Sequence, residues 1–238
     1  MASSANTFES RYLIFWTILL GIVYVVTQPT GQMVLGLGVI SLLSYLKILD
    51  GVRDVEGLRQ TVGTSSLSAT KSSDVKHEQI SLPKFSEAAP LALLALHAFY
   101  GTGHQSTISS IQWKSAFVLT PTVTYPFSPF TVAVNFFGPI FLFVLAAPLL
   151  VPWNRALLPP SNPRLHIARV AVSVMLYYAC LLLTSAASAA LQRRHLMAWK
   201  VFAPRFMAAA ADLAVVDLGV LVGAGIGAER VLHKIAIR

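Results

Sequence analysis

One apolar stretch decides the fold class of this chain: residues 167–191 read IARVAVSVMLYYACLLLTSAASAAL. Its only charged side chain is Arg169. About 20 consecutive apolar residues in a helix cross the roughly 30 Å hydrocarbon core of a bilayer, so this stretch can span a membrane. Further apolar runs cover residues 12–26, 33–48, 88–100, 108–123, 126–151 and 206–228. We therefore predict an all-α protein, a polytopic transmembrane helical bundle of about seven membrane segments.

The composition also indicates a membrane protein. Hydrophobic residues make up 55% of the 238 residues and charged residues 12%, whereas a soluble domain carries about 25% charged residues. The net charge of +8 comes mainly from basic residues that flank apolar runs, where they meet lipid phosphates or set topology. Nucleic acid is therefore not an expected partner. The single cysteine, Cys180, excludes an intrachain disulfide and a cysteine-based zinc site.

The chain divides into three parts. Residues 1–50 are expected to form a membrane helical hairpin with its turn at Pro29. Residues 51–87 mix charges of both signs with Ser, Thr and Gly, so we expect a polar disordered loop, either a plain linker or a regulatory segment. Residues 88–238 are expected to form the main membrane bundle.

The predicted orientation depends on whether segment 108–123 spans the membrane. With seven spans, the basic connector Arg193–Arg205 lies on the same side as Arg11 and the 51–87 loop, and the positive-inside rule places that side in the cytoplasm. The Gly101–Gln105 turn then lies on the opposite side. If segment 108–123 does not span, every later orientation reverses.

A dense polar cluster lies at a membrane boundary, where residues 99–107 read FYGTGHQST. Its glycines allow a tight turn, and its polar side chains offer donors and acceptors to a lipid headgroup. We predict substrate-binding residues at Tyr100, Gly101, Gly103, His104 and Gln105. In the alternative interpretation these groups only satisfy broken helix ends. No metal site is predicted, because His97 and His104 have no acidic or cysteine neighbour.

A second cluster interleaves cations with aromatic rings in residues 192–206, QRRHLMAWKVFAPRF. This composition is typical of an interfacial helix that binds phosphate headgroups. Ordinary positive-inside flanking with an aromatic belt explains it equally well. The predicted lipid or partner contacts are Arg193, Arg194, His195, Trp199, Lys200 and Arg205.

Two carboxylates, Asp212 and Asp217, interrupt the last apolar run. Carboxylates inside a membrane are costly and usually face a partner or a cavity. A spacing of five residues separates the two by about 140° around a helix, so they cannot form a tight acid pair. We predict intramembrane ion pairing with Lys or Arg of a neighbouring span; a proton relay is the alternative. Gly219, Gly223 and Gly227 follow on one helix face, where small residues allow close helix packing.

Taken in order, four stretches resemble the C-terminal membrane portion of a GPI ethanolamine phosphate transferase, of the PIG-O type (transferase 3) and similar to fungal members. The stretches are 99–105 FYGTGHQ, 109–117 SSIQWKSAF, 135–139 NFFGP and 193–206 RRHLMAWKVFAPRF, of which the last is the most specific. Together they cover roughly residues 88–228.

The resemblance implies a multi-pass protein of the endoplasmic reticulum that acts in GPI-anchor biosynthesis. Such enzymes transfer phosphoethanolamine from phosphatidylethanolamine to a mannose of the GPI glycolipid. Their catalytic domain holds two zinc ions and a threonine nucleophile, and nothing in this sequence matches it. We therefore assign no catalytic residue, metal or other cofactor to the chain. We expect a family fragment or truncated gene product, and whether it is itself an enzyme stays open.

Two functions are compatible with the resemblance. In the first, the chain is the membrane part of the transferase and handles lipid substrate, with phosphatidylethanolamine and GPI intermediates as its partners. In the second, it is a non-catalytic membrane module that docks a PIG-F type stabilising subunit.

Overall fold

The computed structural model describes residues 3–65, 85–150, 163–191, 194 and 196–236. Within these ranges the chain is helical and contains no strand, which confirms the all-α prediction. The α-helices are α1 Ser3–Val26, α2 Pro29–Ser65, α3 Phe85–Gly101, α4 Phe127–Leu145, α5 Pro163–Leu191 and α6 Leu196–Ala236. Short 3-10 helices are η1 Ile108–Ser110, η2 Trp113–Phe117 and η3 Ala147–Leu150.

Four helices in the described part of the chain are long and apolar enough to cross a membrane. They contain the segments Pro29–Val52, Phe127–Leu145, Ile167–Leu191 and Phe202–Ile226. Helix α1 adds a shorter apolar stretch, Tyr12–Val26. These spans make the chain a multi-pass membrane protein, but the count of about seven segments is not confirmed.

Segment 108–123 does not form the spanning helix that its apolar residues suggested. It contains η1 and η2 and is otherwise irregular. Local side-chain bonds act at the start of the segment, where Ser110 Oγ donates to the carbonyls of Thr107 (2.7 Å) and Gln105 (2.8 Å). Such bonds compete with continuous helical hydrogen bonding.

Part of the polar segment that was expected to be disordered is helical. Helix α2 continues past the apolar run to Ser65, so the disorder prediction is wrong for residues 51–65. This stretch contains no proline and includes Arg, Glu, Leu and Gln, which are good helix formers. Extending an existing helix requires no new nucleation step, so a polar continuation costs little free energy. Residues 66–84 lie outside the described part.

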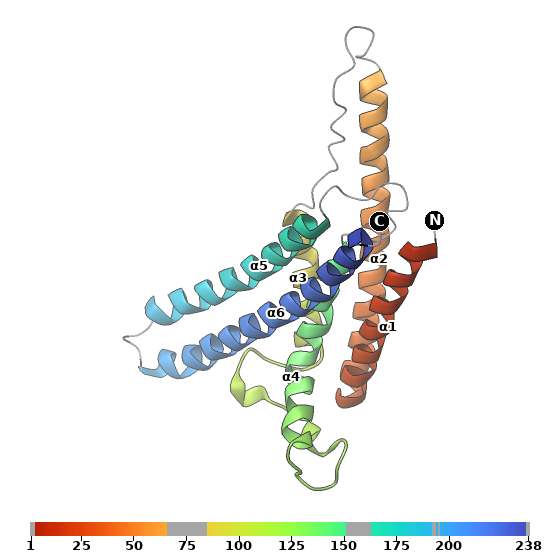
Figure 1. The fold of residues 1–238 in the computed structure, drawn as a ribbon. Coiled ribbons are helices and arrows are strands. Elements are labelled where there is room, and N and C mark those ends of the chain that lie inside the picture. Colours follow the sequence, from red (N-terminus) through yellow and green to blue (C-terminus); the bar gives the residue numbers. More distant parts are fainter. Residues whose placement is uncertain (1–2, 66–84, 151–162, 192–193, 195, 237–238) are drawn as a thin grey trace.

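Helix α4 lies at the centre of the helices. A short turn joins α1 to α2 (Figure 1); α1 packs on α4, whereas α2 packs on α3. Helices α5 and α6 form a hairpin that crosses α3 and α4 obliquely (Figure 1). The turn predicted at Pro29 lies between the two helices, since α1 ends at Val26 and α2 begins at Pro29. The membrane hairpin of residues 1–50 stays a prediction.

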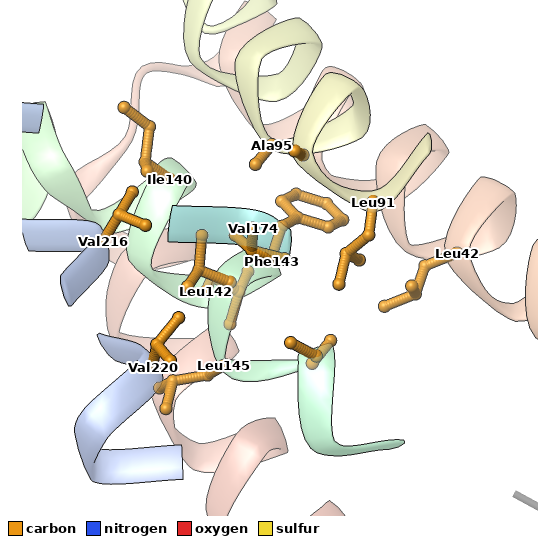
Figure 2. Packing of buried hydrophobic residues seen from close by; sticks show 14 of the residues in the cluster. Leu42, Leu91, Ala95, Ile140, Leu142, Phe143, Leu145, Val174, Val216 and Val220 are labelled. Atoms are coloured by element: carbon orange, nitrogen blue, oxygen red, sulfur yellow. The ribbon is translucent and has the colours of Figure 1, made fainter. Parts of the chain in front are cut away.

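Helix α4 supplies the centre of the apolar core. Residues 142–145 at its C-terminal end have no exposed surface. Figure 2 shows how neighbouring helices meet this end of α4: Leu42 comes from α2, Leu91 and Ala95 from α3, Val174 from α5, and Val216 and Val220 from α6. Close packing of this kind holds helices together within a bilayer, where the lipid tails are as apolar as the core.

Side chains of α1 complete the hydrogen bonding at the end of α4. The last four carbonyls of a helix have no partner within it. Here Trp16 Nε1 donates to the carbonyl of Leu142 at 2.8 Å, and the Tyr12 hydroxyl donates to the carbonyl of Leu145. Nearer the start of α4, Asn135 Nδ2 donates to the carbonyl of Val26 at 3.0 Å. These bonds fix α1 along α4 without leaving the carbonyls unpaired in lipid.

Candidate functional site

A tight turn follows α3 at the predicted break. Thr102 Oγ1 donates to the carbonyls of Ala98 (2.9 Å) and Phe99 (2.8 Å), which satisfies carbonyls at the helix end. Gly103 has φ 89°, a backbone conformation that glycine adopts at no steric cost. The turn therefore has the glycine-dependent geometry that the sequence predicted.

Gly101 allows a close approach between α3 and α2. A Cβ atom at Gly101 would lie 2.5 Å from Val34 Cγ1, so a larger residue would push the helices apart. Nearby in α2, a Cβ atom at Gly31 would lie 3.3 Å from the Cα atom of Thr102. These glycines hold the turn against the start of α2.

His104 lies beneath the turn, with 2% of its surface exposed. Its ring stacks on Phe99 at a centroid distance of 5.3 Å and meets Phe136 edge-on at 5.4 Å. Neither ring nitrogen has a hydrogen-bond partner among the described residues. Burial lowers the pKa of His104 below its ordinary value. The substrate-binding prediction for His104 is untested, but this side chain lies among aromatic rings.

We expect the folded protein to lose thermal stability as the pH falls below about 6.5, the ordinary pKa of histidine. The folded state holds His104 neutral, whereas the unfolded chain binds a proton there, so acidification favours unfolding. Unfolding midpoints at pH 7.5 and 5.5, measured in detergent, should differ less in His104→Phe than in the unchanged protein. His97→Phe, at an exposed position, is the matched control. An identical pH dependence in His104→Phe would contradict the prediction.

A cavity of about 480 Å³ opens beside the turn, between α3, α5 and α6. Each wall contributes both apolar and polar side chains. From α3 and the turn come Leu96, Tyr100, Gln105, Ser106 and Thr107. From α5 come Tyr178, Leu181, Thr184 and Ser185, and from α6 come Arg205, Ala209 and Asp212.

Helical spacing places the α6 residues on one face. Arg205, Ala209 and Asp212 are four and three residues apart, so they form one stripe along the cavity. On the opposite wall, Tyr178 and Ser185 are about two helical turns apart, so they also lie on one face of their helix. These α5 residues were not among the site residues predicted from the sequence, although hydroxyl groups within an apolar span are a signal that could have indicated them.

The structure brings together two clusters that the sequence analysis placed on opposite sides of the membrane. Gln105 from the turn and Arg205 from the basic connector line the same cavity, so the opposite-side prediction is wrong. The cause is segment 108–123, which contains no spanning helix and therefore removes one crossing between the clusters. Of the predicted substrate-binding residues, Tyr100 and Gln105 line the cavity.

Two further residues of the basic connector, Arg194 and Lys200, are described, and neither lines the cavity. Arg194 and Lys200 are exposed. Arg193 and His195 lie outside the described residues, and Trp199 belongs to α6 but its side chain is not described. Their role in lipid or partner contact stays a prediction.

Asp212 and Asp217 differ in their surroundings, as their spacing predicts. Asp212 lines the cavity with 7% of its surface exposed, whereas Asp217 is half-buried away from it. The Oδ1 atom of each has no hydrogen-bond partner among the described residues. The hydroxyl of Tyr178, which is 2% exposed, also has none there. Ion pairing of the two acids stays a prediction.

The described side chains do not fit a metal centre. Among them, no group of three or more His, Cys, Asp or Glu residues is placed to hold an ion. Zinc sites need three or four protein ligands. The site is therefore built from hydrogen-bonding groups, one cation and one buried acid.

Comparison with known proteins identifies relatives of most of the chain. Residues 69–233 match the family described as the GPI ethanolamine phosphate transferase membrane region. A GPI ethanolamine phosphate transferase 3 from Eremothecium gossypii is 31% identical over 219 residues, which cover 90% of this chain and 19% of that protein. The chain thus spans about a fifth of the length of this relative.

Two further relatives carry the same name. GPI ethanolamine phosphate transferase 3 of Saccharomyces cerevisiae is 38% identical over 138 residues, which cover 56% of this chain and 13% of that protein. The human GPI ethanolamine phosphate transferase 3, catalytic subunit, is 32% identical over 171 residues, 56% of this chain and 16% of that protein. No solved structure matches the chain.

Proposed function

The chain belongs to the GPI ethanolamine phosphate transferase membrane-region family, and from this premise we propose that it handles lipid substrate for such a transferase in GPI-anchor biosynthesis. The reaction served is the transfer of phosphoethanolamine from phosphatidylethanolamine to a mannose of a GPI intermediate. The corresponding location is the membrane of the endoplasmic reticulum.

The cavity between α3, α5 and α6 is the observation that carries this proposal. Its volume of about 480 Å³ lies within the range of small-ligand sites. Leu96 and Leu181 offer apolar surface, while Gln105, Ser106 and Arg205 offer hydrogen bonds at the end of a membrane helix. A phospholipid needs this combination, because its headgroup is polar and its chains are not.

The transfer chemistry is assigned to a part of the relatives that this chain does not match. The chain covers 19% of the fungal relative, and the described residues offer no fitting ligand set for the zinc ions that the resemblance implies. The contribution of this chain is to bind and orient a lipid.

Lipid retention tests the proposal directly. We expect the full chain, purified in mild detergent, to retain phosphatidylethanolamine at near-equal molar ratio, as measured by mass spectrometry of extracted lipid. Ala209→Phe fills the cavity and should remove most of that lipid, whereas Ala214→Phe, at an exposed position of the same helix, should not. Equal retention by both variants, or none by the unchanged chain, would contradict the proposal.

The same purified protein distinguishes the second function, docking of a PIG-F type subunit, from lipid handling. Arg194 and Lys200 are exposed and can contact anionic lipid or a PIG-F type subunit. If the chain retains no lipid but binds such a subunit through these residues, it is a docking module and the lipid-handling proposal fails.

A further inference from the structure

A proline interrupts the hydrogen bonding of α4. Pro139 lies inside the helix, and proline has no backbone N–H to donate to the carbonyl four residues earlier, which belongs to Asn135. The proline ring also clashes with that carbonyl in a straight helix. The Asn135 carbonyl therefore lacks its usual helical hydrogen bond, in a residue that is only 1% exposed. A buried acceptor of this kind takes a donor from elsewhere in the fold.

His104 brings a donor to the same part of α4. The imidazole lies against the ring of Phe136, the residue that follows Asn135, at a centroid distance of 5.4 Å. A neutral imidazole carries one N–H, and neither ring nitrogen of His104 has a partner among the described residues. Burial lowers the pKa of His104 and keeps the ring neutral, while the backbone of Asn135 opposes this shift, as an acceptor for a ring N–H does.

We propose that His104 is a positioning residue whose ring N–H donates to the Asn135 carbonyl that Pro139 leaves free. The ring reaches this carbonyl by turning between Phe99 and Phe136, the two aromatic rings that it contacts. The bond replaces the one that the helix has lost, so that neither group stays unpaired in the interior. Asn135 has a second acceptor, the side-chain Oδ1 atom, which also has no partner among the described residues. Substitutions in α4 distinguish the two acceptors.

The proposed bond attaches the turn to a point where α1 already meets α4. There the Nδ2 atom of Asn135 donates to the carbonyl of Val26 at 3.0 Å. Close by, a Cβ atom at Gly138 would lie 2.9 Å from Cγ2 of Val23, so α1 runs directly along this part of α4. The ends of α1 and α3 are thus both held by the same stretch of α4.

The position of the turn matters because the turn carries cavity residues. Tyr100 and Gln105 line the cavity, whereas the buried His104 between them does not. With His104 bonded to α4, these two side chains stand at a fixed place on the cavity wall. This consequence rests on the proposed lipid handling, whereas the bond itself does not.

Nuclear magnetic resonance of the full chain in detergent, with isotope-labelled histidine, tests the bond. At pH 7.5 we expect a histidine ring N–H that exchanges slowly with water, because it is buried and hydrogen-bonded. His104→Phe should remove this signal and so assign it to His104. Absence of such a signal from the unchanged protein overturns the inference.

Two substitutions in α4 identify the acceptor. Pro139→Ala supplies the missing backbone N–H, so the Asn135 carbonyl regains its helical donor and the ring N–H of His104 should exchange faster. Asn135→Ala removes Oδ1 but keeps the backbone carbonyl, so the slow ring N–H should persist. A signal that is lost in Asn135→Ala, or unchanged in Pro139→Ala, overturns the inference, and the first of these tests stands even if Pro139→Ala does not fold.

Thermal unfolding measures the coupling between the histidine and the proline. His104→Phe should lower the midpoint by about 2–4 °C in the unchanged protein, as expected for one lost hydrogen bond, and by at most about half as much in the Pro139→Ala background. Pro90→Ala, which replaces the proline inside α3, is the matched control and should leave the effect of His104→Phe unchanged. Equal effects of His104→Phe in all three backgrounds would refute the proposed bond.

Lipid retention separates this inference from the proposed function. His104→Phe should lose a large part of the phosphatidylethanolamine that the unchanged chain retains, whereas His97→Phe, at an exposed position of α3, should not. Full retention by His104→Phe overturns the positioning role of His104. If the unchanged chain retains no lipid, the proposed function fails, and the ring N–H signal and the coupling to Pro139 still decide whether the bond exists.

Discussion

Replacing Gly38 with leucine is expected to destabilise the bundle strongly, while the same change at Gly36, in the same helix, has little effect. A Cβ atom at Gly38 would lie 2.7 Å from Cζ of Phe143, a side chain that is fully buried in the core. At Gly36 no atom lies within 4 Å of the added Cβ. Overpacking a closed core typically costs about 1–3 kcal/mol, and here α2 must also move away from α4.

Thermal unfolding in detergent measures this difference. Gly38→Leu should lower the unfolding midpoint by several degrees and reduce the yield of monodisperse protein. Gly36→Leu should match or slightly exceed the stability of the unchanged protein, because leucine is a better helix former than glycine by about 0.8 kcal/mol. Equal midpoints for the two variants would show that α2 does not pack on α4 through this glycine.

The fold could be predicted from the sequence where length and hydrophobicity decide it. The run 167–191 lies within α5, and the turn at Pro29 separates α1 from α2. Segment 108–123 could not be predicted in this way, since its apolar content resembles that of a span. Its structure depends on local bonds such as those of Ser110, and hydropathy does not report them.

The sequence predicted that one face of the last helix packs closely, but not which neighbouring helix it packs against. The sequence indicated that Gly219 allows a close approach, and a Cβ atom there would lie 3.1 Å from Phe141 of α4. A small-residue pattern shows which face of a helix packs closely. It does not show which neighbour meets that face, because this depends on the arrangement of all the helices.

The candidate site was predicted as separate pieces. Tyr100, Gln105, Arg205 and Asp212 were each selected from the sequence, and the structure places all four around one cavity. Their convergence could not be predicted, because one miscounted crossing put the turn and the connector on opposite sides. Sequence also gave no sign that His104 packs between phenylalanine rings, since a histidine in a polar turn has the composition of a binding residue.

The convergence of these residues leads to the prediction with the largest expected effect on function. In a full-length active relative, glutamine at the position matching Arg205 should lower kcat/KM for phosphatidylethanolamine about 10- to 100-fold, the range expected for a charged hydrogen bond. Because Arg205 is exposed, protein abundance should not change. Glutamine at the position matching Arg169, an exposed arginine that does not line the cavity, is the control.

The dependence of rate on lipid concentration separates substrate binding from a structural role. If Arg205 binds the donor phosphate, the loss should appear mainly as a higher KM, and raising phosphatidylethanolamine should restore part of the rate. A loss of abundance or of partner co-purification at unchanged KM would instead assign Arg205 to partner contact, together with the exposed Arg194 and Lys200. Equal losses at the positions matching Arg205 and Arg169 would show that general basic charge, rather than the cavity, supports transfer.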